Sequence, residues 1–412
     1  MDRISELSND ILQRILSLLS QEDAVRTSVL SKSWRDIWCT RPNLDLSDTN
    51  FKHEFLSTVD KTLQRYSDQK ICLEKFQLSM SLYYSHSELK SVWFLEKWIR
   101  ALTNMGVKEF RLSIYSKDSR RRRRRVKLPS VVFEAEFLED LHVEGFMFDR
   151  TTIERNILSN HLKKLHLEKV HIEDRIFQKI ISSCPLIETM ILKSCKSIEI
   201  YPPSLETIRI TRGIILFQKG AEFCNLSSLS LREVLISSCS SCRFPKSIEE
   251  SQLFIDAPNI DSFVYHGFDI PSISFSTTSR EWSSTLRFLF RDDPSLWLLK
   301  LRKLLESLSR SEISLGISQH YINAEDIFKE NHDLVQDIKD ENKAAVVVEE
   351  LKLQGDLSYF LPVSNGLFSI CRPRKIGNVS YTDAESVLKN LMQREGGNQD
   401  ELRQLWLPDL EE

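Results

Sequence analysis

The sequence predicts an α/β protein in which an N-terminal three-helix module is followed by an irregular repeat solenoid with a parallel sheet. Apolar residues recur with helical spacing within the first forty residues. Farther along the chain, short apolar alternations typical of strands return again and again. Hydrophobic residues make up 41% of the 412 residues, which is enough to fill a sizeable core. Length alone would suggest two or three domains, but an elongated repeat fold does not follow that rule.

Residues 3–42 contain the signals of three short helices. One apolar stripe of the first helix consists of Ile11, Ile15, Leu18 and Leu19. Leu12 and Leu16 widen this stripe to a second side, so both sides of the helix must be buried. Ser20 begins an S-x-x-D capping signature, and Ser31 is placed to cap a third helix that Pro42 ends. The second helix carries Ala24, Val25, Ser28 and Val29 on one side, and the third carries Trp34, Ile37 and Trp38.

This helical module is too small to enclose its own apolar side chains. A unit of about forty residues with so many large apolar groups has too little interior. Its surplus apolar surface must therefore dock on the rest of the chain or on a partner.

The pattern apolar-x-x-apolar-x-apolar defines the body of the chain. It begins at Leu73, Val107, Leu138, Leu162, Ile187, Leu205, Leu226, Ile260 and Val348. The central spacings are near the roughly 20 to 29 residues of leucine-rich repeats, whose strands stack in parallel. The long gap before the last copy predicts one or two degenerate units, one of them over residues 311–318. We expect residues 319–346 to form a helical excursion, with an interdomain linker as the alternative.

The residues between the apolar positions of each strand should point to the concave face of the solenoid. From these we select a candidate substrate face of His142, Glu144, Lys164, His166, Glu168, Arg209 and Arg232. The face has mixed charge and carries no readable Ser-His-Asp set, phosphate loop or paired catalytic carboxylates. His142 and His166 fall at equivalent repeat positions, which predicts that they lie side by side. Two solvent-facing histidines are a commoner outcome of such a pattern than a metal or catalytic pair.

Charge and cysteine content restrict the functional classes. The net charge is −3, and it would be −9 without the run Arg120, Arg121, Arg122, Arg123, Arg124 and Arg125. Because basicity is confined to one loop, a general nucleic-acid-binding surface is not indicated. The run is typical of an exposed loop or of a nuclear-localisation signal. No apolar signal sequence or transmembrane run is evident, and the eight cysteines are scattered, so we expect free thiols in a reducing compartment. Cys239-x-x-Cys242 lacks a second pair at zinc-site spacing.

The N-terminal module resembles the F-box of plant F-box/leucine-rich-repeat proteins. The phrase "AVRTSVLSKSWRDIW" carries the likeness, and "SSCPLIETMILKSC" and "FIDAPNIDSFVYHG" are similar to the repeats of that family. The family usually has Leu-Pro where this chain has Leu7-Ser8, and we expect Ser8 to act as an N-cap instead. The resemblance weakens after about residue 270, and an FBD-type domain is not clear in the sequence.

The resemblance implies a domain order. It gives an F-box over 1–46, a helical lead-in with a first irregular repeat over 47–105, and leucine-rich repeats over 106–270. Degenerate repeats with the helical excursion follow over 271–375, and a C-terminal tail over 376–412.

The resemblance also implies a function. The chain would be a non-catalytic substrate receptor of an SCF-type ubiquitin ligase, with no cofactor and no metal, in the nucleus or cytoplasm or both. Its partners would be a Skp-type adaptor, through it the cullin and RING subunits, and a protein substrate of unknown identity. The residues that bind the adaptor or form the module's core would be Leu7, Ser8, Ile11, Ile15, Leu18, Leu19, Val25, Val29, Leu30, Trp34 and Trp38. A non-ligase scaffold, and a repeat protein that binds nucleic acid through Arg120–Arg125, remain as alternatives.

Overall fold

The computed structural model divides into two compact units, residues 1–198 and 199–412. It describes residues 7–19, 21–48, 53–82, 88–116, 126–150, 157–193, 207–211, 223–227, 231–237, 252–267, 270–276, 281–290, 294–319, 344–354 and 361–377. No helix in these ranges is long and apolar enough to cross a lipid bilayer. The arginine run, Cys239-x-x-Cys242, residues 320–343 of the expected helical excursion and residues 378–412 of the tail lie outside these ranges.

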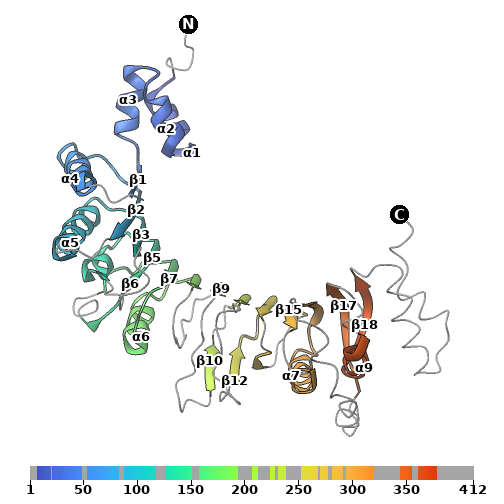
Figure 1. Ribbon diagram of the computed structural model, residues 1–412. Coiled ribbons are helices and arrows are strands. Elements are labelled where there is room, and N and C mark those ends of the chain that lie inside the picture. The colour runs from blue at the N-terminus through green and yellow to red at the C-terminus, as the bar shows by residue number, and fades with distance from the viewer. Residues whose placement is uncertain are drawn as a thin grey trace. The chain divides into compact units, whose positions relative to one another are not determined.

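The first unit begins with the predicted three helices, α1 (Asn9–Leu18), α2 (Gln21–Thr27) and α3 (Lys32–Cys39) (Figure 1). Their shared core consists of Leu12, Leu16, Ala24, Trp34 and Ile37, with Ile15 and Trp38 packed against it. Ser31 caps α3 as predicted, because its Oγ accepts a hydrogen bond from the Trp34 amide at 3.2 Å. A hydrogen bond links the segment after α3 to the part of the chain that follows the module. In it, Tyr66 Oη donates to the carbonyl oxygen of Arg41 at 3.0 Å.

The rest of the first unit is a parallel sheet with helices on one face (Figure 1). Its strands, in hydrogen-bonded order, are β1 (Asn43–Asp48), β2 (Lys75–Leu82), β3 (Glu109–Ser116), β5 (Asp140–Glu144), β7 (Lys164–Glu168) and β8 (Thr189–Lys193). The covering helices are α4 (His53–Asp68), α5 (Glu88–Asn104), the 3₁₀ helix η1 (Ser130–Glu134) and α6 (Asp174–Ser183). A short parallel pair, β4 (Val126–Lys127) with β6 (Phe146–Met147), lies outside the main sheet.

The core of this unit is built from rows of apolar side chains in strict register. One row runs across the sheet through Leu44, Phe76, Phe110, Leu141, Leu165 and Met190. All six are buried. The helices present apolar residues at i, i+3, i+4 and i+7 to this layer, as Leu95, Trp98, Ile99 and Leu102 of α5 do. The predicted alternation is thereby confirmed for β2, β3, β5, β7 and β8.

The second unit repeats this arrangement with a longer set of strands. The main sheet is β9 (Thr207–Thr211), β11 (Glu233–Ser237), β13 (Ser262–Gly267), β15 (Ser283–Phe290), β16 (Glu312–Gln319), β17 (Val346–Gln354) and β18 (Cys371–Gly377), all parallel. A second parallel sheet contains β10 (Phe223–Ser227), β12 (Gln252–Asp256) and β14 (Ser272–Phe275). Among the residues of this unit that the structure describes, the helices are α7 (Pro294–Ser307) and α9 (Leu361–Ile370). The degenerate unit expected at 311–318 is confirmed as β16.

One predicted strand of the second unit has the wrong register. The pattern starting at Leu226 placed a strand up to Leu231, but the strand that joins the main sheet is β11, over Glu233–Ser237. Leu231-x-x-Val234-x-Ile236 fits the same pattern, and pairing of Val234 with Ile208 of β9 selects it. Arg232 therefore precedes the strand instead of lying within it.

Candidate functional site

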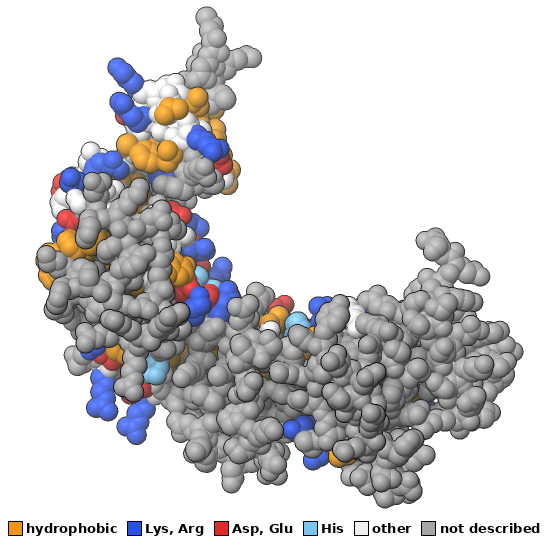
Figure 2. All heavy atoms as spheres, viewed as in Figure 1, with side chains coloured by type: hydrophobic (Ala, Val, Ile, Leu, Met, Phe, Trp, Pro, Cys, Tyr) orange, Lys and Arg blue, Asp and Glu red, His pale blue; other side chains and the backbone are white. Residues whose placement is uncertain are grey.

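The face of the first sheet that lies away from the helices, here called the open face, carries the polar side chains of the strands. Its middle row, in register across six strands, is Asp45, Gln77, Arg111, His142, His166 and Ile191. The next row is Ser47, Ser79, Ser113, Glu144, Glu168 and Lys193. Basic, acidic and histidine side chains occur together on the surface of this unit (Figure 2). The predicted mixture of charges on this face is confirmed.

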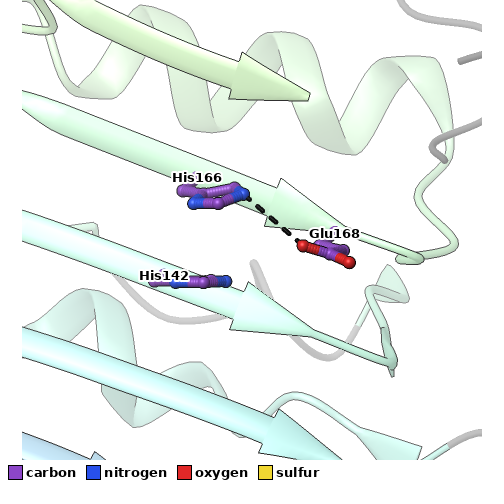
Figure 3. A group of neighbouring side chains, drawn as sticks. All are labelled: His142, His166 and Glu168. Carbon is purple, nitrogen blue, oxygen red and sulfur yellow. Dashed lines mark ion pairs between the residues drawn. The ribbon is translucent and has the colours of Figure 1, made fainter. Parts of the chain in front are cut away.

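His142 and His166 form a stacked pair at the centre of the open face. They are register partners on β5 and β7, and their rings are nearly parallel, with centroids 3.8 Å apart and planes inclined by 16° (Figure 3). The predicted juxtaposition is therefore confirmed. Both histidines lie on the open face as expected, but they are less exposed to solvent than expected. Both side chains are half-buried, and the Nε2 atom of each is fully covered. Within the described part of the chain, neither Nε2 has a hydrogen-bond partner.

The surroundings of this pair favour neutral imidazoles. Burial, assisted by the neighbouring His142, Lys193 and Arg111, lowers the pKa of His166 to about 4. Burial also lowers the pKa of His142, assisted by Arg111. The 3.8 Å contact between His166 Nε2 and Glu168 Oε2 is consequently not an ion pair at neutral pH, because the imidazole is uncharged.

The carboxylates beside the histidines are held by lysines. Lys169 Nζ donates to Glu144 Oε1 at 2.6 Å and lies 3.3 Å from Glu168 Oε1. Lys193 Nζ lies 3.6 Å from Glu168 Oε2. Burial opposes the ionisation of Glu144, but hydrogen bonds from Lys169 and Tyr115 outweigh it, so its pKa lies below the ordinary value. The open face is thus a network of paired charges around two unpaired imidazoles.

The remaining residues predicted for the open face lie at three different kinds of position. Lys164 lies on β7, beside Asp140 of β5 in the register. Arg209 lies on β9 of the second unit, paired in register with Leu235 of β11. Arg232 is a correction: it precedes β11 and its Nη1 makes an ion pair with Asp261 Oδ2 at 3.1 Å.

The structure divides the residues of the helical module into an inner and an outer set. Trp34 belongs to the core, and Ile15 and Trp38 pack against that core. The outer apolar set, exposed on the module, consists of Leu7, Ile11, Leu18, Leu19, Val25, Val29 and Leu30. Leu18, Val29 and Leu30 are the most exposed, at 83%, 82% and 65% of their full area. Orange hydrophobic side chains are visible on the surface of this module in Figure 2.

Ser8 takes the predicted position but makes no side-chain cap. It is the N-cap residue of α1, and its carbonyl oxygen accepts the first helical hydrogen bond, from the Leu12 amide at 3.0 Å. Its hydroxyl makes no capping hydrogen bond, so that part of the expectation is wrong. Its φ of −63° is one that proline also adopts, so the backbone at this position matches the Leu-Pro pattern.

Sequence reasoning selected His142 and His166 of the middle row but missed Arg111, which lies in the same row. Arg111 lies between Phe110 and Leu112, so the alternation rule that selected His142 would have selected it as well. Lys169 was missed for a different reason. It follows β7 in a left-handed backbone conformation, φ 51°, which brings its ammonium group back to Glu144, and no sequence pattern signals this.

Comparison with known proteins agrees with this architecture. Residues 4–46 match the family model of the F-box domain, and residues 95–281 match the model of the leucine-rich repeats of FBD-associated F-box protein At5g56370. Similar Arabidopsis thaliana proteins include putative F-box/LRR-repeat protein At3g18150, 28% identical over 52% of this chain and 43% of the relative. F-box/FBD/LRR-repeat protein At5g22660 is 28% identical over 66% of this chain and 54% of the relative. F-box/FBD/LRR-repeat protein At2g04230 is 27% identical over 73% of this chain and 74% of the relative.

The chain spans about half the length of the first two of these relatives. The two matched regions are the helical module and a stretch of repeats that includes β3, β5, β7 and β8 of the open face. The chain therefore belongs to the family of plant F-box proteins with FBD-associated leucine-rich repeats.

Proposed function

We propose that the chain is the substrate receptor of an SCF-type cullin-RING ubiquitin ligase. It would bind a Skp-type adaptor through the helical module and a protein substrate through the repeats. The F-box match supports the first part, because the F-box is in general the module that binds Skp-type adaptors. The open face of the repeats supports the second, since it is a wide polar surface on a rigid sheet.

The observation that carries the proposal is the outer apolar set on a module whose core is already complete. The core residues of the three helices are at most 4% exposed, so the module has no interior left for Leu18, Val29 or Leu30. Burying one such side chain in a partner contributes about 1.5–3 kcal/mol. Seven such residues on one small module form a surface suited to an apolar partner, as an F-box surface is to the adaptor.

In this proposal the chain performs no bond chemistry. It holds a substrate close to the ubiquitin carried by the other subunits, which turns a bimolecular encounter into an intramolecular one. The gain comes from the effective concentration of the tethered substrate. The charged side chains of the open face would supply specificity. A partner would need charges opposite to those of Arg111 and Glu144 at matching positions, and groups that suit the histidines.

Co-purification with a Skp-type adaptor tests the proposal. The double variant Val29→Asp with Leu30→Asp places two charges in the turn between α2 and α3, outside the core, so it should abolish co-purification while the module stays folded. Arg35→Asp is the matched control, because Arg35 is exposed on α3 and also gains an acidic side chain. Failure of the natural chain to bind the adaptor would refute the proposal, as would full binding by the double variant.

A reconstituted ubiquitination assay separates a ligase subunit from a non-ligase scaffold. Proteins that co-purify with the repeats would be offered to the assembled complex with and without the cullin. Cullin-dependent ubiquitination of a captured protein supports the receptor function. Adaptor binding without any cullin-dependent product would favour the scaffold.

A further inference from the structure

We propose that His142, His166 and Glu168 form a binding site for a late first-row divalent metal ion such as Zn²⁺ on the open face of the first unit. This goes beyond the proposed role in ubiquitin transfer and does not depend on it. The three side chains are drawn in Figure 3.

The strand register brings the three ligand atoms together. His142 and His166 are partners on adjacent parallel strands, and Glu168, two residues after His166, projects from the same face. One ligand atom from each residue lies within 4.8 Å of the others, and His166 Nε2 is 3.8 Å from Glu168 Oε2. Tetrahedral ligands with metal bonds of about 2.0–2.1 Å lie roughly 3.3 Å apart. Closures of about 0.5 Å for the 3.8 Å pair, and of at most about 1.5 Å for the other pairs, would therefore complete the site.

This closure is a rotation of the imidazole rings. In two parallel rings the nitrogen lone pairs point in parallel directions and do not converge on one position. The angle of 16° between the ring planes must therefore increase when both rings bind one ion. Rotation about the Cβ–Cγ bond has a broad energy profile for histidine, so the rings can turn without leaving their rotamers. Stacking in the metal-free protein and coordination in the loaded protein are two arrangements of the same pair.

The imidazole nitrogens are the independent sign that something is to be bound. Both Nε2 atoms are fully covered and have no hydrogen-bond partner among the residues that the structure describes. Covered polar atoms of folded proteins almost always have a partner, and an exception indicates a missing water, ion or functional contact. A neutral imidazole offers its unprotonated nitrogen as a lone-pair donor, which a metal ion satisfies.

The donor set selects the kind of ion. Two imidazoles and one carboxylate are the ligands of open zinc sites, in which a fourth position remains for water or an incoming group. Ca²⁺ and Mg²⁺ prefer oxygen-only surroundings and are disfavoured here. Lys193 lies 3.6 Å from Glu168 Oε2, the oxygen that faces His166, so the ammonium and the metal compete for the same carboxylate.

This competition distinguishes a cation site from an anion site. Arg111 and Lys193 lower the affinity for a metal ion by charge repulsion but would raise the affinity for an anion such as phosphate. Lys193→Gln should therefore strengthen metal binding. A different pair of results would indicate an anion site in place of the metal site. The natural chain would bind no metal, and Lys193→Gln would bind inorganic phosphate more weakly than the natural chain does.

Co²⁺ titration of the full chain provides the test. The protein is stripped with a chelator and kept reduced, and visible absorption follows binding. Binding by the proposed residues gives ligand-field bands without thiolate-to-cobalt charge-transfer bands, which separates it from binding by the eight cysteines. We expect one equivalent of Co²⁺, displaced by Zn²⁺. Loss of a residue that only hydrogen-bonds a metal ligand typically weakens metal affinity by roughly 10- to 100-fold. His166→Ala and Glu168→Gln each remove a ligand itself, so each should weaken Co²⁺ binding by at least that factor.

His266→Ala is the matched control, because His266 is exposed on β13 of the second unit and should leave binding unchanged. Glu168→Gln keeps the shape of the side chain, so its effect cannot be ascribed to misfolding when its circular dichroism matches that of the natural chain. Absence of Co²⁺ binding, thiolate-type bands alone, or equal binding by the natural chain, His166→Ala and Glu168→Gln would each overturn the proposal.

Discussion

Single side chains of the open face owe their chemistry to their neighbours across the sheet. The alternation of apolar and polar residues predicted that His142 and His166 would be adjacent. It could not predict their stacking, their covered nitrogens or the lowered pKa of His166, because these arise only where side chains of several strands pack together; Arg111 and Lys193, for example, help to lower that pKa. In the helical module, likewise, both sides of α1 are apolar in sequence. Only the packing of Leu12 and Leu16 against Trp34 showed which side faces inward.

The half-buried His166 makes the stability of the metal-free protein depend on pH. Its pKa is about 4 in the folded chain, against an ordinary value of 6.5. Between these values the unfolded chain binds more protons, so the free energy of unfolding should fall as the pH drops from 6.5 towards 4, whereas above 6.5 this contribution is fully present. The titratable and charged groups around it are His142, Arg111, Glu144, Glu168 and Lys193.

Urea unfolding at a series of pH values measures this dependence. The natural chain in chelator should lose stability across that interval, and His166→Gln, which cannot take up a proton, should lose less of it. Equal slopes for the two proteins would show that His166 is not held neutral by the fold.

At the scale of the element, strands were predictable where the apolar pattern has a single register. The patterns beginning at Leu138, Leu162 and Ile187 each gave one strand at the expected place. The pattern after Leu226 fits two registers, and pairing with β9 decides between them, so the sequence alone selected the wrong one. The second sheet, β10-β12-β14, was not predicted because its strands lie in the connections between repeats and share the same alternation.

The two serine caps of the helical module should differ in energetic importance. Ser31 Oγ accepts from the Trp34 amide, whereas Ser8 makes no side-chain cap. Ser31→Ala should cost about 0.5–2 kcal/mol of helix stability, and Ser8→Ala close to none. Hydrogen exchange of the first-turn amides of α3 and of α1 measures both. Equal losses of protection in the two variants would contradict this assignment.

Gly145 is required by the turn between β5 and β6. Its φ is +81°, and an added Cβ would overlap the Ile114 carbonyl oxygen on the neighbouring strand. Gly145→Ala should therefore destabilise the first unit by at least about 1–3 kcal/mol. Gly316→Ala is the control, since a Cβ there would lie 3.5 Å from Arg287 Cγ, in ordinary contact. Thermal unfolding of both variants tests this, and a Gly145→Ala midpoint as high as that of Gly316→Ala would contradict it.

For the molecule as a whole, the order of a helical module followed by repeats was predictable because each part has its own period. Helical spacing in residues 3–42 and strand alternation from Leu73 onward are local signals, and the comparisons match both parts. The fastening of the module to the repeats was not predictable. It depends on Tyr66 and Arg65 of α4 reaching backbone carbonyls of Arg41 and Cys39, which no sequence period encodes.

We propose that the arginine run directs all or part of the protein from the cytoplasm to the nucleus. The run is a block of like charge in a chain whose net charge is −3, which suits an exposed import signal better than a general nucleic-acid surface. A fluorescent fusion of the natural chain should be nuclear or shared between the two compartments. Replacing Arg120–Arg125 by glutamine should shift it to the cytoplasm, and an unchanged distribution would rule out this role.

The central claim is that the helical module offers its outer apolar set to a Skp-type adaptor. Isothermal titration of the full chain with the purified adaptor at several temperatures tests it most directly. We predict saturable binding with a negative heat-capacity change, the signature of apolar burial, and loss of that binding in Val29→Asp with Leu30→Asp but not in Arg35→Asp. No heat of binding, or equal affinity in the double variant and the natural chain, would contradict the account.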